Sequence, residues 1–434
     1  MTVLRYESHL PFSPDAVYAW HARPGAFERL VPPWERMHIR REEGDFEHRR
    51  VTLDVRIGPV GVRWVAQHQE AEPGRQFVDV MAEGPLRRWR HVHRFIPQDD
   101  GCELSDVIEF DAIGARLLER GLRRLFEFRH ARTRHDLERH AAWPARRLRV
   151  AITGATGTIG RALKAFLTTG GHEVLTVSRG TTGDVPWNPP RGELDAARLE
   201  GLDAVVHLAG HNVSQRRWSA AEKRRIVDSR VVGTRLLCQV LARLSQPPKV
   251  VVAGSATGWY GDRAEPVDET SSAGAGFLAE VCRQWEAEAI VPGVRVVHLR
   301  TGVVLTSLLA RLLLPFRLGL GGQLGSGRQM LPWISLDDLV AIIGHAIFTD
   351  SLSGPLNAVA PGAVSNADFT RAVGKIVHRP TVMTVPAAAV RAVFGQMGEE
   401  VLLSGCAVRP KRLEETGFRF FYPRLEEALR FEVA

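Results

Sequence analysis

The chain has 434 residues, enough for two or three domains, and its 44% hydrophobic and 24% charged residues are ordinary for a globular protein. Its apolar runs stay shorter than the ~18 residues of a membrane span, and its first residues lack a signal-peptide pattern, so we expect a cytoplasmic protein. The four cysteines are scattered and form no CxxC pair, which predicts reduced structural thiols rather than disulfides or a cysteine metal site.

The net charge of +8 comes mainly from arginine, and the densest basic stretch spans residues 116–149. Acidic residues are interspersed along this stretch, including Glu119, Glu127, Asp136 and Glu138. This pattern favours the solvated face of an amphipathic helix over a nucleic-acid surface, which needs a concentrated basic face.

Residues 1–145 read as an α+β domain. A strand is expected at 2–10, a helix capped by Ser13 with Pro14 at its first position, and a short second helix at 26–30. Further strands are expected at 47–55, 60–68, 76–81, 88–96 and 102–110. A long last helix carries Leu118, Leu122, Leu125 and Phe126 on one face.

This order of elements, with the phrases Leu10–Pro14 and Trp89–Phe95, resembles the START/Bet v1-like (SRPBCC) domains. The resemblance implies a helix-grip fold, in which a curved sheet wraps the C-terminal helix around an apolar cavity for a hydrophobic ligand. A purely structural or docking role stays open as the alternative.

His91 and His93 alternate on one face of an expected strand. With no third ligand apparent in the sequence, we favour packing or surface roles for these histidines and predict no metal site.

A linker around Pro144 leads to a strand at 150–152, a glycine turn and a helix from Ile159. In such a turn the first glycine permits the tight bend, the second admits a pyrophosphate, and the third lets helix and strand pack closely. We therefore predict a dinucleotide site, and an ordinary βα turn is the alternative. Its expected residues are Gly154, Thr156, Gly157, Thr158, Ile159 and Gly160.

The next expected strand ends at Ser178 and Arg179, nineteen residues after Gly160. NAD sites place an acid here for the ribose 2′-hydroxyl, whereas an arginine accommodates the 2′-phosphate. The nearest following acid is Asp184, so the sequence favours NADP; the alternative is one more surface arginine.

Two more buried strands are expected, within 202–210 and 249–261, with a helix from Ser219 between them. Repeated strand–helix units predict a doubly wound parallel sheet, an α/β Rossmann fold. The residues Leu208, Ala209 and Gly210 end one strand and are expected to lie against the cofactor.

The glycine turn, Val206–Ala209, Gly233–Thr234 and Pro332–Asp338 resemble the extended short-chain dehydrogenase/reductases, the NAD(P)-dependent epimerase/dehydratases. A closer resemblance is to the branch called epimerase family proteins. It is carried by Gly254–Gly261, Leu299–Leu305, Phe316–Gln329 and the C-terminal phrases Pro410–Leu413 and Gly417–Phe418. The expected organisation is a START-like domain at 1–145, a Rossmann domain at 148–380 and the branch's C-terminal segment at 381–434.

The resemblance also identifies a departure. The superfamily pairs a tyrosine with a lysine four residues later, and the lysine lowers the phenol pKa so that tyrosinate exchanges a proton with substrate. None of the four tyrosines of this chain has that lysine, and Glu280 occupies an expected lysine position. Ser255 then matches the substrate-polarising serine, and Tyr260 with Glu280 is the remaining acid–base candidate. The alternative is that neither residue is catalytic: Ser255 then only caps a turn, and Tyr260 packs with Trp259 over the nicotinamide.

Further site residues follow from the same resemblance. Ser255 and Arg300 are expected at the cofactor, Trp259 and Arg328 at the substrate, with Arg328 gripping an anion or serving only surface charge. Asp337 and Asp338 favour a structural role at the start of a helix over acid–base work.

The sequence thus predicts an NADP-binding oxidoreductase or epimerase-like protein acting on an unknown small molecule, lipid-like or polyketide-like rather than a sugar. The alternative is a catalytically weak NADP-binding sensor or scaffold with a hydrophobic-ligand domain. Nucleic-acid binding is the least favoured hypothesis.

Overall fold

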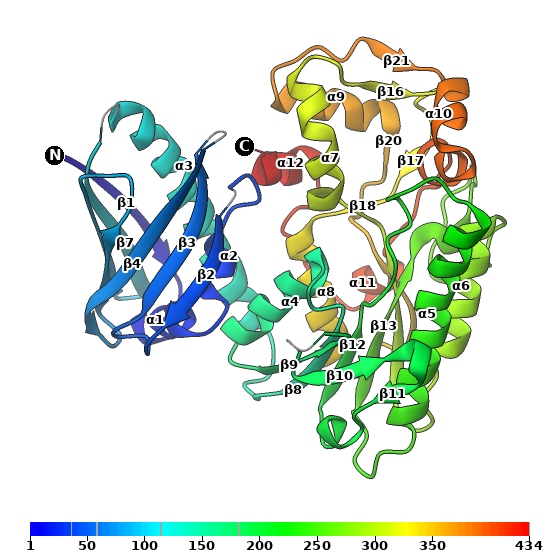
Figure 1. Cartoon of the computed structure of the whole chain (residues 1–434), viewed down its shortest axis with the longest axis horizontal. Coiled ribbons are helices and arrows are strands. Elements are labelled where there is room, and N and C mark those ends of the chain that lie inside the picture. Colours follow the sequence, from blue (N-terminus) through cyan, green and yellow to red (C-terminus); the bar gives the residue numbers. More distant parts are fainter. Residues whose placement is uncertain (36, 58–59, 113–114, 181–182, 434) are drawn as a thin grey trace. The chain divides into compact units, whose positions relative to one another are not determined.

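The protein, described here from a computed structural model over residues 1–35, 37–57, 60–112, 115–180 and 183–433, divides into two compact units. Unit 1 comprises Met1–Ala145 with Thr168–Gly171, and unit 2 comprises Arg146–Leu167 with His172–Ala434 (Figure 1). Unit 1 is a START-like α+β domain and unit 2 is a Rossmann-type α/β domain, as the sequence predicts.

Unit 1 is built on an antiparallel sheet with the strand order β1-β7-β6-β5-β4-β3-β2. Its strands are β1 (Thr2–Leu10), β2 (Met37–Glu43), β3 (Arg50–Ile57), β4 (Val60–Glu72), β5 (Gln76–Glu83), β6 (Arg88–Gln98) and β7 (Gly101–Asp111). The strand β2 is missing from the sequence prediction. It is an edge strand whose mostly charged, exposed side chains give no apolar alternation.

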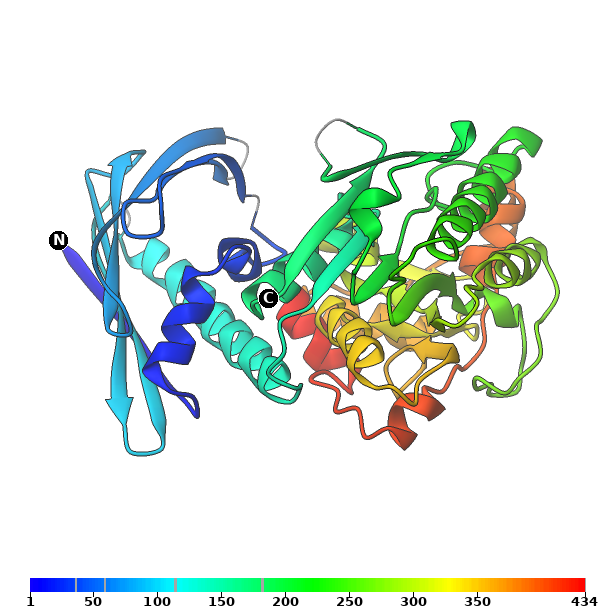
Figure 2. The same ribbon diagram turned by 90° about the horizontal axis from the view of Figure 1, so that it is seen from below.

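Helices cover one face of this sheet: α1 (Pro14–Ala22), α2 (Ala26–Leu30) and α3 (Ala115–Ala141). Figure 2 shows α3 running along the sheet, and its buried Leu122 and Phe126 pack against Leu4, Ile108 and Phe110. At α1 the Ser13 hydroxyl accepts a hydrogen bond from the Ala16 amide, as predicted.

The expectation that the charges of the basic stretch lie on a solvated helix face is wrong for part of α3. Arg132 is buried, and the buried Asp136 accepts two hydrogen bonds from Arg29 at 2.6 and 2.8 Å. These charges therefore tie α2 to α3. The side chain of Arg116 lies outside the described residues.

The view that His91 and His93 lack further ligand residues is also wrong. Both are buried, and Asp79 from β5 and Asp106 from β7 lie beside them. Neighbouring strands bring these carboxylates onto the face that carries the histidines, a proximity the linear sequence does not reveal.

Unit 2 contains a sheet of order β11-β10-β9-β8-β12-β13-β14-β19, parallel from β10 to β19. Its strands are β8 (Arg149–Thr153), β9 (Glu173–Ser178), β10 (Val185–Asn188), β11 (Glu193–Leu194), β12 (Ala204–His207), β13 (Val250–Ala256), β14 (Arg295–Thr301) and β19 (Gly354–Ala358). The strand order reverses between β8 and β12, which is where dinucleotide sites form in such folds.

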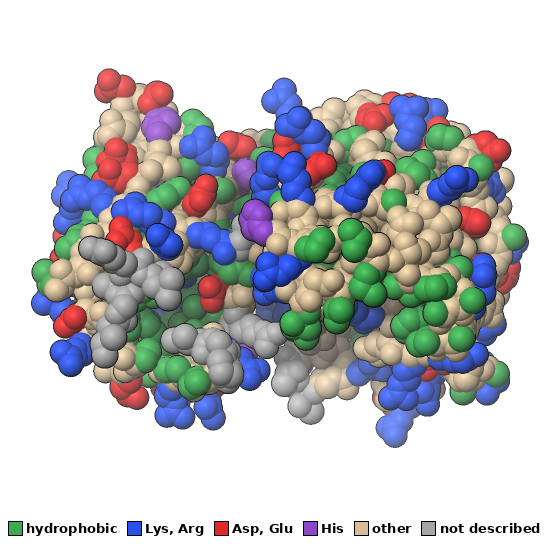
Figure 3. Space-filling model, turned by 90° about the horizontal axis from the view of Figure 1, so that it is seen from above, with side chains coloured by type: hydrophobic (Ala, Val, Ile, Leu, Met, Phe, Trp, Pro, Cys, Tyr) green, Lys and Arg blue, Asp and Glu red, His purple; other side chains and the backbone are tan. Residues whose placement is uncertain are grey.

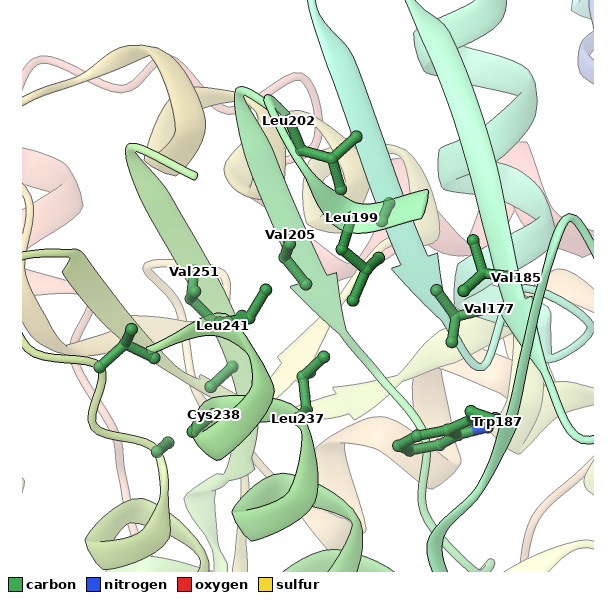
Figure 4. Close-up of a cluster of buried hydrophobic side chains, with 14 residues drawn as sticks. Val177, Val185, Trp187, Leu199, Leu202, Val205, Leu237, Cys238, Leu241 and Val251 are labelled. Carbon is green, nitrogen blue, oxygen red and sulfur yellow. The ribbon is translucent and has the colours of Figure 1, made fainter. Parts of the chain in front are cut away.

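Helices pack on both faces of the sheet, α5 (Ala220–Leu241) and α6 (Phe277–Glu288) on one, α4 (Thr158–Thr169) and α8 (Leu336–Phe348) on the other (Figure 2). Figure 4 shows the core beneath α5, where Leu237 and Leu241 meet Val205 and Val251. Because both faces are covered, these strands are almost continuously apolar.

The C-terminal segment is part of unit 2 and not a separate body. Val267 and Val408 form a parallel bridge, and α11 (Lys411–Glu415) packs against β19. The other elements of this half are β15 (Val303–Val304), α7 (Leu305–Arg317), β16 (Gly322–Leu324), β17 (Met330–Leu331), β18 (Trp333–Ile334), β20 (Val364–Ser365), α9 (Asn366–Ile376), β21 (Met383–Val385), α10 (Ala387–Phe394) and α12 (Leu425–Val433). Short 3-10 turns (η1 Pro189–Arg191, η2 Ala197–Leu199, η3 Thr257–Tyr260) and the π-helical turn η4 (Gly398–Leu403) complete the unit.

Hydrophobic side chains are exposed between basic ones on the face of unit 2 that Figure 3 shows. The large exposed apolar residues of the unit include Leu314, Leu318, Leu320, Val382 and Val393. Among the described residues, no helix is both long and apolar enough to cross a membrane.

Candidate functional site

The glycine turn between β8 and α4 is closed by backbone packing that leaves no room for side chains. Gly154 has φ +69°, and a Cβ there would lie 2.9 Å from backbone atoms of Leu208 and Ala209. A Cβ on Gly160 would lie 2.3 Å from the Gly154 carbonyl oxygen. Both positions therefore require glycine, which is the packing expected of a dinucleotide turn.

The start of α4 is open to solvent. Thr156, Gly157 and Thr158 are exposed and Ile159 is half-buried. A Cβ on Gly157 would meet only the Gly154 oxygen, at 3.3 Å. Exposed amides at a helix N-terminus, with their partial positive charge, suit the phosphates of a dinucleotide.

Thr153 and His207 join the glycine turn to the next strand. The Thr153 hydroxyl accepts hydrogen bonds from the amides of Leu208 and Ala209 and lies 2.7 Å from His207 Nδ1. The other nitrogen of His207 lies 3.0 Å from the Thr234 hydroxyl on α5. Burial lowers the pKa of His207 to about 4, so the ring is a neutral structural link. The sequence interpretation missed this role; the polar residues inside two apolar strands were the available signal.

The end of β9 carries the residues expected to select the cofactor. Arg179 is exposed, and among the described residues it forms no ion pair. Ser178 is half-buried, and its hydroxyl donates to Gly180 O at 3.4 Å. The nearby Asp184 accepts hydrogen bonds from the amide and hydroxyl of Thr176, each at 2.7 Å. With this carboxylate engaged, Arg179 is an exposed charged group that could meet a ribose substituent.

Ser255, Tyr260 and Arg300 are brought together, but in a buried network. Ser255 donates to Glu286 at 2.6 Å, and Glu286 accepts two hydrogen bonds of 2.9 Å from Arg300. Arg300 also donates to the Tyr260 hydroxyl at 3.0 Å, and that hydroxyl donates to Asn357 at 2.7 Å. The chain of bonds links η3 and β13 to α6, β14 and β19.

Electrostatics and burial favour a structural role for this network. Burial raises the pKa of Tyr260 to about 12, although Arg300 acts in the opposite direction. Burial opposes ionisation of Glu286, but bonds from Arg300, His298 and Ser255 lower its pKa to about 2. Tyr260 has no exposed surface. This geometry does not fit the expectation that Ser255 polarises substrate and Tyr260 acts as an acid, nor that Arg300 touches cofactor.

Glu280 is not the partner of Tyr260. Its carboxylate is exposed on α6 and binds Arg283 and Gln284. The partners of the phenol are Arg300 and Asn357 instead. The helical position was predicted correctly, but Glu280 lies on the solvent face of the helix.

A cavity of about 310 Å³ opens beyond the carboxyl ends of β13 and β14. One part of its wall comes from η3 and the loop after it, from the loop before α5, and from α5 and α6. The other part comes from the segment after β14, from β17 and from the C-terminal segment. The lining residues include Val213, Arg230, Ala256, Thr257, Gly258, Leu278, Val281, Cys282, Trp285, Thr301, Met330, Leu331, Val401 and Cys406. The lining is mainly apolar, as in most small-molecule sites.

The face of α6 that lines this cavity carries no tyrosine or lysine. Its pairs four positions apart are Leu278–Cys282 and Val281–Trp285. Burial raises the pKa of Cys282 to about 11, so the thiol stays protonated. The wall therefore lacks the acid–base pair of the superfamily.

Arg230 is the basic residue of the cavity wall, and the sequence interpretation missed it. Its guanidinium lies 4.9 Å from the Trp285 ring centroid and donates to the carbonyl oxygens of His211 and Ile226. Burial lowers its pKa to about 10, and it has no carboxylate partner among the described residues. Only its position on α5 opposite α6 reveals that it faces the cavity.

Trp259 and Arg328 do not line this cavity. The guanidinium of Arg300 stacks on Trp259 at 3.9 Å from the ring centroid, so the indole covers the buried network. Arg328 is exposed, and its amide donates to the Ser326 hydroxyl. The substrate roles expected for these two residues therefore lack support from the geometry of the cavity.

Asp338 has the structural role that the sequence favours. The carboxylate accepts hydrogen bonds from the Ser335 hydroxyl and from the amides of Phe421 and Tyr422. It therefore fixes the C-terminal segment to the start of α8. Asp337, which precedes it in the chain, is buried in the first turn of α8.

The C-terminal segment also completes the cavity. Glu400 accepts hydrogen bonds from the amides of Phe277 and Leu278 at 3.1 and 3.0 Å, capping α6. Asp262 accepts one from the Gly405 amide at 2.9 Å. These contacts hold the C-terminal segment against the carboxyl edge of the parallel sheet.

The fold, the glycine turn and the cavity at the carboxyl edge of the sheet define a Rossmann-type dinucleotide-binding protein. Residues 150–277 match the NAD dependent epimerase/dehydratase family, residues 10–136 match polyketide cyclase/dehydrase and lipid transport proteins, and residues 385–432 match a domain of unknown function.

An epimerase family protein of Mycobacterium bovis is 44% identical over 292 residues, which are 65% of this chain and 96% of that protein. The chain therefore belongs to the epimerase family of proteins. A crystal structure of human epimerase family protein SDR39U1 with NADPH is 37% identical in sequence, with a TM-score of 0.62. The match covers 65% of this chain and 98% of the human chain. A nucleoside-diphosphate sugar epimerase from Corynebacterium glutamicum shares 33% identity and covers 99% of this chain and 90% of its own, with a TM-score of 0.83.

Proposed function

We propose that unit 2 binds NADP(H) in preference to NAD(H) and holds a small substrate for hydride transfer in the adjoining cavity. The observation that carries the cofactor assignment is the exposed Arg179 at the end of β9, where the nearest following acid, Asp184, is already bound to Thr176. The glycine positions that admit no Cβ support a dinucleotide site of either kind. The NADPH in the human relative agrees with it.

The residues present fit this cofactor. The amides at the start of α4 would hold the pyrophosphate, and Arg179 would hold the 2′-phosphate. A nicotinamide bound at the carboxyl edge of the sheet supplies or accepts a hydride. The chain's own contribution is to orient both partners in a mainly apolar cavity.

The cavity supports a substrate with an apolar body and one anionic group. Most of its wall is apolar, and Arg230 presents a half-buried guanidinium that, among the described residues, donates to carbonyl oxygens and to no carboxylate. A carboxylate or phosphate on the substrate would supply the missing anion, and charge-assisted hydrogen bonds of this kind are strong. This lining favours a lipid-like or polyketide-like compound over a sugar.

One observation favours a second candidate, a binding protein with little turnover. The cavity wall carries no tyrosine or lysine among the described residues, and Tyr260 is fully buried. A reaction on a hydroxyl or carbonyl then lacks the tyrosine acid of the superfamily, and loss of general acid–base catalysis lowers a rate about 10²–10⁴-fold.

The test is calorimetric titration with NADPH and NADH of the unaltered protein, an Arg179→Ala variant and an Arg243→Ala control. Arg243 is exposed and follows α5, at the amino edge of the sheet. Loss of a charge-assisted contact of about 1.5–3 kcal/mol raises the Kd for NADPH about 10- to 150-fold and leaves that for NADH unchanged. Equal affinities for both nucleotides in the unaltered protein would refute the cofactor preference.

Turnover then separates the two candidates. Oxidation of NADPH is followed with a panel of aromatic and aliphatic keto acids. Turnover with any of them supports the oxidoreductase. Tight NADPH binding without turnover on the panel supports the binding protein.

A further inference from the structure

Unit 1 contains a buried cluster of imidazoles and carboxylates that the proposed function does not use. His91 and His93 lie on β6, Asp79 on β5, Asp106 on β7 and His130 on α3. All but Asp79 are less than one-tenth exposed, and Asp79 is partly covered. The cluster sits between the sheet and the helix that covers it.

Three of these residues have the arrangement of metal ligands. One ligand atom each from Asp79, His91 and His93 lies within 4.8 Å of the other two. Two imidazoles and a carboxylate around one point are a common ligand set for divalent zinc and iron, in which further positions stay open to water or substrate.

The surrounding groups have the arrangement of an outer ligand shell. Asp106 Oδ1 lies 2.8 Å from His91 Nε2 and 2.7 Å from His93 Nδ1, and its Oδ2 lies 2.6 Å from His130 Nε2. The Ser8 hydroxyl completes the chain at 2.6 Å from His130 Nδ1. Carboxylates that orient ligating histidines are a regular part of protein metal sites.

Two buried polar atoms of the cluster each face a single partner of opposite charge: His93 Nδ1 lies 2.7 Å from Asp106, and Asp79 Oδ1 lies 3.0 Å from His68. Phe77 stacks on His93, with ring centroids 4.1 Å apart, and shields it from water. Two carboxylates buried at one point need positive charge beside them, which a bound divalent cation would supply.

One contact of the cluster, His68, also lines an open cavity at the edge of the domain. This cavity, of about 610 Å³, is lined by residues of β4 and β5 and by the loop before β3. His68 Nε2 lies 3.0 Å from Asp79 Oδ1. His68 therefore connects the cavity to the cluster.

We propose that Asp79, His91 and His93 form a site for a divalent first-row transition-metal ion, with Asp106 as the residue that orients both histidines. The inference concerns unit 1 and is independent of NADP binding by unit 2. The START-like domain would then bind a metal ion, whereas its resemblance to other such domains implies a hydrophobic ligand.

The test uses the full chain, prepared without an affinity tag, treated with chelator and titrated with Co²⁺, whose visible absorption reports imidazole and carboxylate ligation. Zn²⁺ content after reloading is measured by mass spectrometry. We expect saturable, stoichiometric Co²⁺ binding by the unaltered protein. Asp79→Asn and His93→Gln should lose the Co²⁺ spectrum, while Asp106→Asn should weaken binding about 10- to 100-fold.

The control is His9→Gln, which removes an exposed histidine paired with Asp100 on the same sheet. Asp79→Asn has nearly the same shape as the parent side chain, and circular dichroism checks that each variant is folded. Co²⁺ binding that is absent from the unaltered protein, or equal in Asp79→Asn and His9→Gln, would overturn the site. Loss confined to the cluster variants supports it.

Discussion

Replacing Gly160 by alanine tests the glycine turn directly. The added Cβ would lie 2.3 Å from the Gly154 carbonyl oxygen and 2.7 Å from the Ala155 Cα, and Cβ atoms essentially never come within 3.0 Å of another heavy atom. Both neighbours are backbone atoms, so the turn itself must move. Overpacking of this kind costs about 1–3 kcal/mol of the free energy of unfolding.

The displaced turn should also bind NADPH more weakly. Loss of one charge-assisted hydrogen bond to a phosphate, about 1.5–3 kcal/mol, raises the Kd about 10- to 150-fold. Thermal unfolding of the variant measures the first effect, and calorimetric titration with NADPH measures the second.

Two other glycines provide graded comparisons. At Gly157 the Cβ would lie 3.3 Å from its nearest neighbour, so Gly157→Ala should affect stability little and NADPH binding strongly. At Gly121, on α3 of unit 1, nothing lies within 4 Å, so Gly121→Ala should leave NADPH binding unchanged. A Gly160→Ala protein with unaltered stability and affinity would refute the packing argument.

Tyr260→Phe should lower the free energy of unfolding by about 1–3 kcal/mol, because Asn357 and Arg300 each lose a buried partner, and leave the Kd for NADPH unchanged. An unchanged unfolding midpoint with lost turnover would instead make the phenol catalytic. Ionised Glu286 should stabilise unit 2 above its unfolded pKa of 4.5, and this contribution, roughly 3 kcal/mol, should disappear as pH falls toward the folded pKa of about 2. Urea unfolding between these pH values measures it, and a Glu286→Gln protein with the same pH dependence would contradict the assignment. Arg230→Gln should weaken binding of an anionic probe such as benzoate about tenfold, measured by tryptophan fluorescence, with NADPH affinity retained. Equal benzoate affinity in both proteins would exclude an anion-binding role.

Local patterns in the sequence determined where most helices, turns and strands begin and end. The apolar run before Gly154 and the spacing of the three glycines identify the strand, the turn and the helix, because the glycine requirement arises within a few residues. Ser13 and Ser219 mark helix starts for the same reason, since a cap bonds amides three residues ahead. The edge strand β2 escaped prediction because its solvent-exposed charges carry no burial signal.

Tertiary structure decided which side chains meet and which of them reach a cavity. Tyr260 and Ser255 were identified from their strand, but only the packing of β14 and α6 against it reveals that Arg300 and Glu286 enclose them. Arg230 reaches the cavity because α5 and α6 lie side by side.

Asp79 is another residue whose contacts only the tertiary structure reveals. It joins the two histidines only because β5 and β6 pair in register, with Asp79 opposite His91. Such contacts depend on the relative placement of distant segments, which periodicity and spacing along one strand do not encode.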